Sequence, residues 1–312
     1  MEYTNKNCFA AYGIGLSLER EFYYSIRQII YEALVEEVMT TPKPGLVDTR
    51  DNGAHTDMEP ISFIKSAIAI SPYLTEMFEL GCGWERELKH LFLYVRKLGM
   101  TAEKAMYLAT DGINTHKGMI FSMGILSTAA GYTWRHTRSF DYKTILKISR
   151  SMTEDILETE FKEIKGKQPK TNGERLYHKY GERGIRGEAQ RGFPIIREVS
   201  YPLLKQYLYE GYHQNESYIN VLLEIIVHLN DTCVLSRSSD TELKWFQKRA
   251  REILMLGGAF SKDGMEEIVK LNGECIKKHI SPGGAADLLA CTIFLWKLKR
   301  YEEQLCEKRK ER

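Results

Sequence analysis

Four polar loops in the sequence combine glycine with acids, bases and amides, which are groups able to bind and transform a charged ligand. They are the segments 42–58, 111–118, 173–194 and 281–290. Glycine permits backbone conformations that other residues resist. One arginine side chain can bind two phosphate oxygens at once, and helix N-termini attract anions. The loops therefore predict a site for a polyphosphate, provided that the fold brings them together.

Each loop offers side chains that suit such a ligand, and a structural role is the alternative for each of them. Asn114 and Ser281 could instead cap helices, and Lys117 could be solvated. The segment NDTCVLSR (230–237) adds Arg237 near the end of an apolar helix, where a structural ion pair is the alternative. The candidates for substrate binding are Lys43, Asn52, His55, Asn114, Lys117, Arg183, Arg186, Arg237, Ser281, Gly283, Gly284 and Asp287.

Helices must hold these loops in place, and apolar residues recur at helical spacing along most of the chain. The sequence has no alternating strand-like pattern, repeat or low-complexity linker. We predict an all-α fold, a single large multi-helix domain over residues 1–312 with functional inter-helix loops, in which about the first 20 and last 10 residues are peripheral. The predicted helices cover 18–41, 61 onward with a potential break at Pro72, 84–98, 101–109, 117–134, 141–165, 195–210, 216–230, 240–257, 263–279 and 282–308.

The segment 118–134 carries no charged residue and must be compared with a membrane span. It is slightly short for the roughly 20 apolar residues that a span needs, and it contains several glycine, serine and threonine residues. Small residues let neighbouring helices approach closely. We therefore predict a buried central helix and no membrane partner.

The composition excludes other classes of function. The 44 basic and 42 acidic residues leave a formal charge of +2, which gives no electrostatic footprint for a nucleic acid. The six cysteines show no metal-ligand spacing, and the N-terminus has no secretory signal. No Ser-His-Asp or Cys-His constellation is evident. These features predict a cytoplasmic protein with free thiols.

Six segments closely resemble, in order and spacing, motifs of the triphosphoribosyl-dephospho-CoA synthase family, and the resemblance covers roughly residues 25 to 300. It implies an all-helical enzyme, a pentosyltransferase that converts ATP and 3'-dephospho-CoA into 2'-(5''-triphosphoribosyl)-3'-dephospho-CoA and adenine. The product is the prosthetic-group precursor for the acyl carrier protein of citrate lyase or of malonate decarboxylase. The segments are PKPGLVD (42–48), NGAHTDM (52–58), DGINTHKGMIFSMG (111–124), GERLYHKYGERGIRGEAQRGFP (173–194), NDTCVLSR (230–237) and SPGGAADLLA (281–290).

The resembled reaction breaks the bond between adenine and C1' of the ATP ribose and joins C1' to the 2'-hydroxyl of dephospho-CoA. Mg²⁺ is expected as Mg-ATP, with Asp48 and Asp111 as its candidate protein ligands, although Asp111 could instead cap a helix. Glu188 is the first candidate for the general base, and Glu174 and His116 are further candidates for proton transfer. The triphosphate is expected to bind Lys43, Lys117, Arg183, Arg186 and the helix start at Ser281.

The sequence departs from the family pattern at two places. Ser238, Ser239 and Asp240 follow Arg237 where the family has glycines, and Ala285 replaces a serine. No further domain for transfer to the carrier protein is evident, so a separate downstream transferase is expected to act on the product.

Two other functions are compatible with the same loops. A helical enzyme similar to nucleoside or ADP-ribosyl hydrolases would use water as the acceptor. A non-catalytic nucleotide-binding protein would bind ATP without turnover. The sequence does not distinguish the two carrier proteins, and it leaves open whether the chain forms a homodimer.

Overall fold

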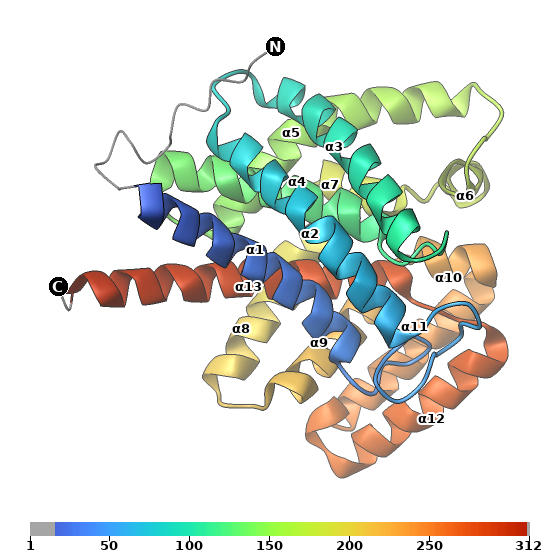
Figure 1. Cartoon of the computed structure of the whole chain (residues 1–312). Helices are drawn as coiled ribbons and strands as arrows, with labels where there is room; N and C mark the ends of the chain where they lie inside the picture. The colour runs from blue at the N-terminus through green and yellow to red at the C-terminus, as the bar shows by residue number, and fades with distance from the viewer. Residues whose placement is uncertain (1–15, 311–312) are drawn as a thin grey trace.

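The computed structural model describes residues 16–310 of the chain, with side chains from 20 to 308. This part contains α-helices, one π-helical turn and one 3₁₀ turn, and no β-strand, so the prediction of an all-α fold is confirmed (Figure 1). The elements in chain order are α1 (Leu16–Met39), α2 (Pro60–Cys82), α3 (Leu88–Ala109), α4 (Lys117–Thr137), α5 (Tyr142–Lys165), α6 (Asn172–Tyr180), α7 (Gly184–Gln190), η2 (Ile196–Ser200), α8 (Tyr201–Tyr209), α9 (Gln214–His228), α10 (Thr232–Arg237), α11 (Asp240–Met255), η3 (Gly258–Phe260), α12 (Lys262–Lys278) and α13 (Gly283–Lys310).

Helix α4 is the central helix, because 14 of its 21 residues are buried. It packs most extensively against α2, and glycines on both helices allow this close approach. A Cβ on Gly81 would lie 2.0 Å from the carbonyl oxygen of Thr128, and a Cβ on Gly131 would lie 2.0 Å from that of Phe78. The predicted packing of a helix rich in small residues is thus observed. In the described part of the chain, no helix is long and apolar enough to cross a membrane.

Helix α13 runs across the bundle and carries its N-terminal end to the side where the polar loops gather (Figure 1). It contacts α1, α4 and α9. Lys297 fixes it to α1 through ion pairs with Glu32 at 2.8 Å and Glu36 at 2.6 Å. These ion pairs fix the middle of α13 to α1.

Several predicted boundaries differ from the structure. Residues 84–109 contain one helix, α3, rather than two, and α2 continues through Pro72. The segment between the predicted helices 141–165 and 195–210, where no helix was predicted, contains α6 and α7. Helix α6 begins with a capping box in which the Thr171 hydroxyl accepts from the backbone N–H of Glu174, and the Glu174 carboxylate accepts from that of Thr171.

A pocket between four helix ends

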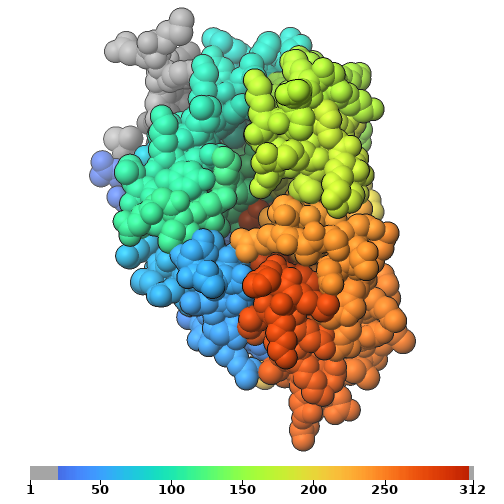
Figure 2. All heavy atoms as spheres, turned by 90° about the vertical axis from the view of Figure 1, so that its right-hand side faces the viewer, coloured from blue at the N-terminus to red at the C-terminus, as the bar shows by residue number. Residues whose placement is uncertain are grey.

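Several polar segments line a pocket of about 480 Å³, here called the main pocket. In Figure 2 it lies between the green α3–α4 region, the yellow-green α6 region and the orange α10–α11 region, with a red part of α13 at its bottom. Its lining comes from Glu37 of α1, the 43–63 segment, residues 114–119, the start of α6, α10, and residues 281–287. Three of the four polar loops and the 230–237 segment therefore meet here, and the 173–194 segment contributes its first turn.

The 40–59 loop keeps its shape through backbone contacts that a bulkier residue would prevent. Gly45 has φ +76°, and a Cβ there would lie 2.1 Å from the carbonyl oxygen of Ile280. Asn272 of α12 accepts a hydrogen bond from the Gly45 N–H at 2.9 Å and donates one to Asp51 at 2.8 Å. The loop is thus fixed against the segment that precedes α13.

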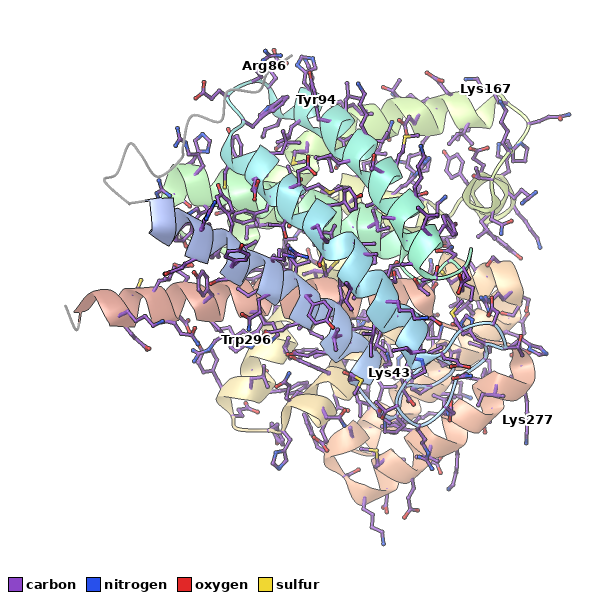
Figure 3. The ribbon with its side chains drawn as sticks, in the orientation of Figure 1. Lys43, Arg86, Tyr94, Lys167, Lys277 and Trp296 are labelled. Carbon is purple, nitrogen blue, oxygen red and sulfur yellow. The ribbon has the colours of Figure 1, made fainter. Side chains whose placement is uncertain are left out.

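Lys43 is a buried cation at the pocket wall. Its Nζ lies 2.6 Å from both Glu37 Oε1 and the backbone carbonyl oxygen of Glu37, and the two side chains are 1% and 5% exposed. Figure 3 shows Lys43 among crowded side chains where α1 meets the 40–59 loop, whereas Lys277 projects from the outer side of α12. Since the pair is nearly free of solvent, each charge depends on the other.

His55, Ser281 and Arg237 connect three separate segments at the pocket edge. His55 Nε2 lies 2.8 Å from Ser281 Oγ, and Nδ1 lies 3.4 Å from an Arg237 guanidinium nitrogen. Burial and the charge of Arg237 lower the pKa of His55. A neutral imidazole can therefore hold the Ser281 hydroxyl beside the start of α13 while Arg237 keeps its charge free for a ligand.

The second polar loop, 111–118, brings three candidate residues to the same pocket. Asn114 Oδ1 accepts from the Lys117 N–H at 3.2 Å, so Asn114 also has the capping role considered above. Lys117 pairs with Glu103 at 3.0 Å and is 53% exposed. His116 Nδ1 lies 2.7 Å from Ser66 Oγ, and Phe63 packs against its ring edge to face.

Asp231 joins α10 to α13. Its Oδ1 accepts from the N–H of Cys233 at 2.8 Å, and its Oδ2 accepts from the N–H of Ala285 at 2.9 Å. A Cβ on Gly284 would lie 3.0 Å from Asp231 Oδ1, so a side chain there would crowd this carboxylate. Ala285 contributes its backbone to this contact and is fully buried, so its methyl replaces the family serine at a position that does not line the pocket.

Asp287 is the carboxylate of the pocket lining that has no hydrogen-bond partner among the described residues. A Cβ on Gly118 would lie 2.2 Å from Asp287 Oδ2, so the absent side chain at Gly118 makes room for the carboxylate beside the start of α4. Burial first, and then the nearby carboxylates of Asp231 and Glu37, raise the pKa of Asp287 well above its ordinary value. An unpaired carboxylate in such surroundings can accept a proton or attract a developing positive charge.

His116 is buried, and its Nε2 has no hydrogen-bond partner among the described residues. Burial first, and then the charge of Lys43, lower its pKa to about 3. The unfolded chain, with an ordinary histidine pKa of about 6.5, binds one more proton than the folded chain between these values. Folding stability should therefore fall as the pH drops below about 6.5, by about 1.4 kcal/mol per pH unit from this residue.

This pH dependence can be measured with His116→Asn, which keeps a polar atom near Ser66 but does not titrate. Between pH 6.5 and 5.0, the unfolding free energy of the native chain should fall by about 2 kcal/mol more than that of the variant. Urea unfolding at the two pH values measures the difference. Equal losses in both proteins would show that His116 takes up its proton in the folded state as easily as in the unfolded state.

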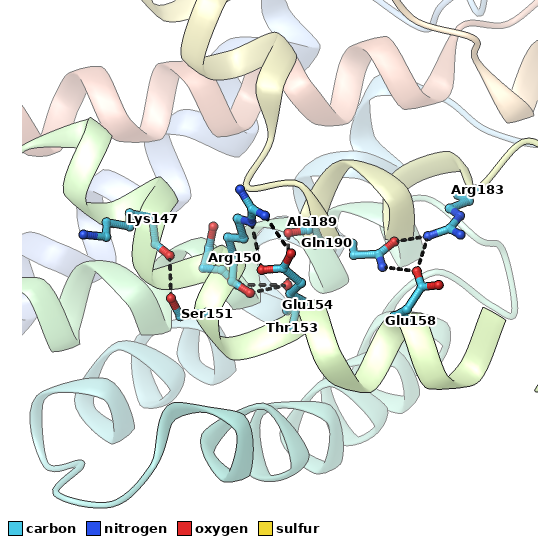
Figure 4. Close-up of polar contacts among 10 residues, drawn as sticks. Lys147, Arg150, Ser151, Thr153, Glu154, Glu158, Arg183, Ala189 and Gln190 are labelled. Carbon is cyan, nitrogen blue, oxygen red and sulfur yellow. Dashed lines mark hydrogen bonds and ion pairs between the residues drawn. The ribbon is translucent and has the colours of Figure 1, made fainter. Parts of the chain in front are cut away.

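The arginine-rich part of the third loop lies at a different, smaller pocket of about 230 Å³, here called the second pocket. Glu188 is buried there, and its carboxylate pairs with Arg191 at 2.8 Å. Burial raises the pKa of Glu188, and Arg191 opposes this effect. Arg183 donates to Glu158 and Gln190 at 2.8 and 2.6 Å (Figure 4). Glu188 and Arg183 therefore do not line the main pocket.

The remaining predicted residues line neither pocket. Both oxygens of Asp48 accept backbone N–H groups, from Lys43, Arg50 and Asp51. Asp111 is exposed with φ +53°. Three further predicted residues make contacts that support the fold. The backbone carbonyl of Asn52 accepts a hydrogen bond from the His55 N–H, and Arg186 lies 3.9 Å from Glu160. Glu174 belongs to the α6 capping box.

Two residues near the pocket were not anticipated from the sequence. Glu37 continues the buried face of α1, because it follows Ile30 and Ala33 at intervals of seven and four residues. A charged residue at a core position of a helix indicates a buried ion pair. The sequence therefore contained the signal that could have identified Glu37. Ser66 similarly lies on the buried face of α2, and nothing in its spacing indicates a partner such as His116.

Comparison with known proteins gives consistent matches over most of the chain. The family described as "CitG: ATP:dephospho-CoA triphosphoribosyl transferase" matches residues 24–305. A probable 2-(5''-triphosphoribosyl)-3'-dephosphocoenzyme-A synthase of Vibrio cholerae is 36% identical over 276 residues, which cover 88% of this chain and 88% of that protein. The 2-(5''-triphosphoribosyl)-3'-dephosphocoenzyme-A synthase of Haemophilus ducreyi is 35% identical over 302 residues, which cover 89% of this chain and 90% of that protein. Protein CitXG of Leuconostoc mesenteroides is 36% identical, and the match covers 87% of this chain and 59% of that protein. No solved structure matches.

Proposed function

The chain belongs to the ATP:dephospho-CoA triphosphoribosyl transferase family, and from this premise we propose that the main pocket binds ATP and transfers its triphosphoribosyl group. The acceptor is the 2'-hydroxyl of 3'-dephospho-CoA, and adenine leaves. The product is the precursor of the prosthetic group of an acyl carrier protein, either that of citrate lyase or that of malonate decarboxylase. A separate transferase attaches it to that carrier protein.

The unpaired Asp287 carboxylate is the observation that carries this proposal. Positive charge develops at C1' of the ribose when the bond to adenine breaks, and a nearby carboxylate stabilises it, as in glycoside cleavage. The raised pKa of Asp287 also suits a general base. In the transfer, the C1'–N bond breaks with its electrons going to adenine, the C1'–O bond forms, and the hydroxyl proton passes to Asp287. The departing adenine takes up one proton from solvent and leaves neutral, and Asp287 afterwards releases its proton to solvent.

The triphosphate is expected at the edge of the pocket, where cations from separate segments are exposed. Lys117 and Arg237 line this edge, and the hydroxyl of Ser281 lies beside the start of α13. Cationic side chains and a helix N-terminus both favour phosphate oxygens. Lys43 contributes less directly, since Glu37 already balances its charge.

Mg²⁺ would enter with ATP as part of the substrate. Within the described residues no group of three or more histidine, cysteine, aspartate or glutamate side chains could hold a metal ion. The carboxylates of the described lining are Glu37 and Asp287, and Glu37 is already paired. Such a lining fits an ion that is bound chiefly by phosphate oxygens and water, as Mg²⁺ often is.

His116 is assigned a positioning role. With a pKa of about 3 its imidazole is uncharged at neutral pH, so it contributes a hydrogen bond rather than a positive charge. Ser66 fixes the ring through Nδ1. The unpartnered Nε2 is left for the ribose or the adenine.

Replacing Lys117 by alanine should raise the KM for ATP by about tenfold, as loss of one exposed charged hydrogen bond to phosphate predicts, and should change the KM for dephospho-CoA by less than about twofold. Lys277→Ala is the matched control, because Lys277 is an exposed lysine that projects away from the pocket (Figure 3). Steady-state kinetics with each substrate varied in turn gives both constants. An equal rise in both KM values would contradict phosphate binding by Lys117 and would indicate that its role is purely structural.

A further inference from the structure

The second pocket lies beside the main pocket, near the start of α10, and the reaction above does not use it. Its volume is about 230 Å³. Its lining is polar and consists of the residues Gly181, Glu182, Arg183, Gly184, Glu188, Arg191, Ile195, His228, Leu229 and Asn230.

The two pockets adjoin at a wall that contains Gly184 and Thr232. Gly184 lines the second pocket and Thr232 lines the main pocket. Gly184 has φ +54°, and a Cβ there would lie 2.9 Å from Thr232 Oγ1. The absence of a side chain at Gly184 thus keeps this wall thin. On the same wall, Asn230 donates to Glu182 at 2.9 Å, so the α6–α7 turn and the start of α10 are held together.

The second pocket has cations with unused hydrogen-bond donors. Arg183 makes its hydrogen bonds to Glu158 and Gln190 through Nη1 (Figure 4). Its guanidinium stacks over the Phe161 ring at 4.6 Å. Arg191 uses Nη2 for Glu188, and its side chain is 62% exposed. The remaining donors of both guanidinium groups suit phosphate oxygens, which arginine binds in a fork.

The same pocket has acceptors for hydroxyl groups. Glu188 is buried, and its two oxygens accept one hydrogen bond each, from Arg191 at 2.8 Å and from the Ile195 N–H at 3.4 Å. Glu182 uses one oxygen for Asn230. Carboxylate oxygens have room for more than one donor each. Arginines beside carboxylates match a nucleotide, whose phosphates and ribose hydroxyls lie close together.

We infer that the second pocket binds the diphosphate of dephospho-CoA and holds its ribose at the edge that it shares with the main pocket beside Gly184 and Thr232, so that the 2'-hydroxyl faces into the main pocket. This inference rests on the proposed function. A transfer between two nucleotides needs the attacking oxygen within roughly 3–3.5 Å of C1', so the two sites must adjoin. The main pocket, with Lys117, Arg237 and the α13 start, takes the more highly charged triphosphate, and the two arginines of the second pocket take the diphosphate.

Arg191→Ala tests the inference. The KM for dephospho-CoA should rise by about 10- to 100-fold, as loss of a charged hydrogen bond to phosphate predicts, while the KM for ATP changes by less than about twofold. Arg300→Ala is the control, since Arg300 forms an ion pair with Glu303 at the same three-residue spacing and outside both pockets. Removing Arg191 leaves the buried Glu188 unpaired, so the double variant Arg191→Ala, Glu188→Gln is measured beside it, with the melting temperature of each.

The possible results separate the two proposals. A selective rise in the KM for dephospho-CoA in both the single and the double variant supports the second pocket as its site. A selective rise in the KM for ATP would place the triphosphate there and overturn the inference, and unchanged constants in a folded variant would also overturn it. If the native chain transferred nothing to dephospho-CoA, the proposed function itself would fail, whatever the variants did.

Discussion

Asp287→Asn should reduce kcat by about 10² to 10⁴, the range that one positioned acid–base group typically contributes. The substitution keeps the size of the side chain and removes its charge. The transition state then loses both the proton acceptor for the 2'-hydroxyl and the negative charge beside C1'. Because the ground state of ATP carries no positive charge at C1', the KM for ATP should change little. Initial rates of adenine release at saturating substrates measure kcat directly.

Asp263→Asn is the matched control for this substitution, since Asp263 is an exposed carboxylate in the first turn of α12. It should leave kcat unchanged. If Asp287→Asn lowered kcat by less than about tenfold, another group would have to supply the base, because one lost catalytic contact usually costs more. The role assigned to Asp287 would then be abandoned.

Lys43→Met should lower the free energy of unfolding by about 3–5 kcal/mol, the usual cost of removing one partner of a buried ion pair. Glu37 would be left as an uncompensated charge, and its backbone carbonyl would also lose a donor. Urea denaturation followed by circular dichroism measures the loss.

Two further variants separate the buried charge from general damage. The double variant Lys43→Met, Glu37→Gln removes both charges and should recover most of the lost stability, because replacing a whole buried pair is often neutral. Lys244→Met, which breaks the exposed pair with Asp240, should cost less than about 1 kcal/mol. If the double variant were as unstable as Lys43→Met alone, the cost would lie in packing rather than in the unpaired carboxylate.

The long helices could be predicted because the spacing of their apolar residues indicates which face of each helix is buried. The predicted segments 117–134 and 263–279 correspond to α4 and α12 within a few residues at each end. Helix α3 was divided at Gly99, yet Val95, Ala102 and Met106 continue one buried face across that glycine. These residues follow one another at helical intervals of seven and four, so the sequence contained the signal for one helix, and the division at Gly99 overlooked it.

The short helices could not be predicted in the same way. Helix α7 contains Gly184 and Gly187, and glycine residues favour a loop over a helix. It is held by α5, because the Thr153 hydroxyl donates to the carbonyl oxygen of Ala189 at 3.0 Å (Figure 4). A contact between residues so far apart in the sequence overrides the local preference.

The convergence of the loops was predictable in outline, but the division into two pockets was not. Loop composition placed Lys43, His55, His116 and Asp287 in one group, and all of them line the main pocket. Glu188 has the same composition around it, yet α5 and α7 place it in the second pocket. The sequence specifies which residue types each loop offers, whereas the packing of the helices decides which of the two pockets these residues line.

The central claim is that the main pocket transfers the triphosphoribosyl group of ATP to dephospho-CoA and excludes water as the acceptor. It is tested most directly by incubating the full chain with ATP and Mg²⁺, with and without dephospho-CoA, and measuring adenine and product masses by mass spectrometry. We predict adenine release only with dephospho-CoA, together with one equivalent of an adduct whose mass is the sum of both substrates less adenine. Adenine release at the same rate without dephospho-CoA, with no adduct, would contradict the account.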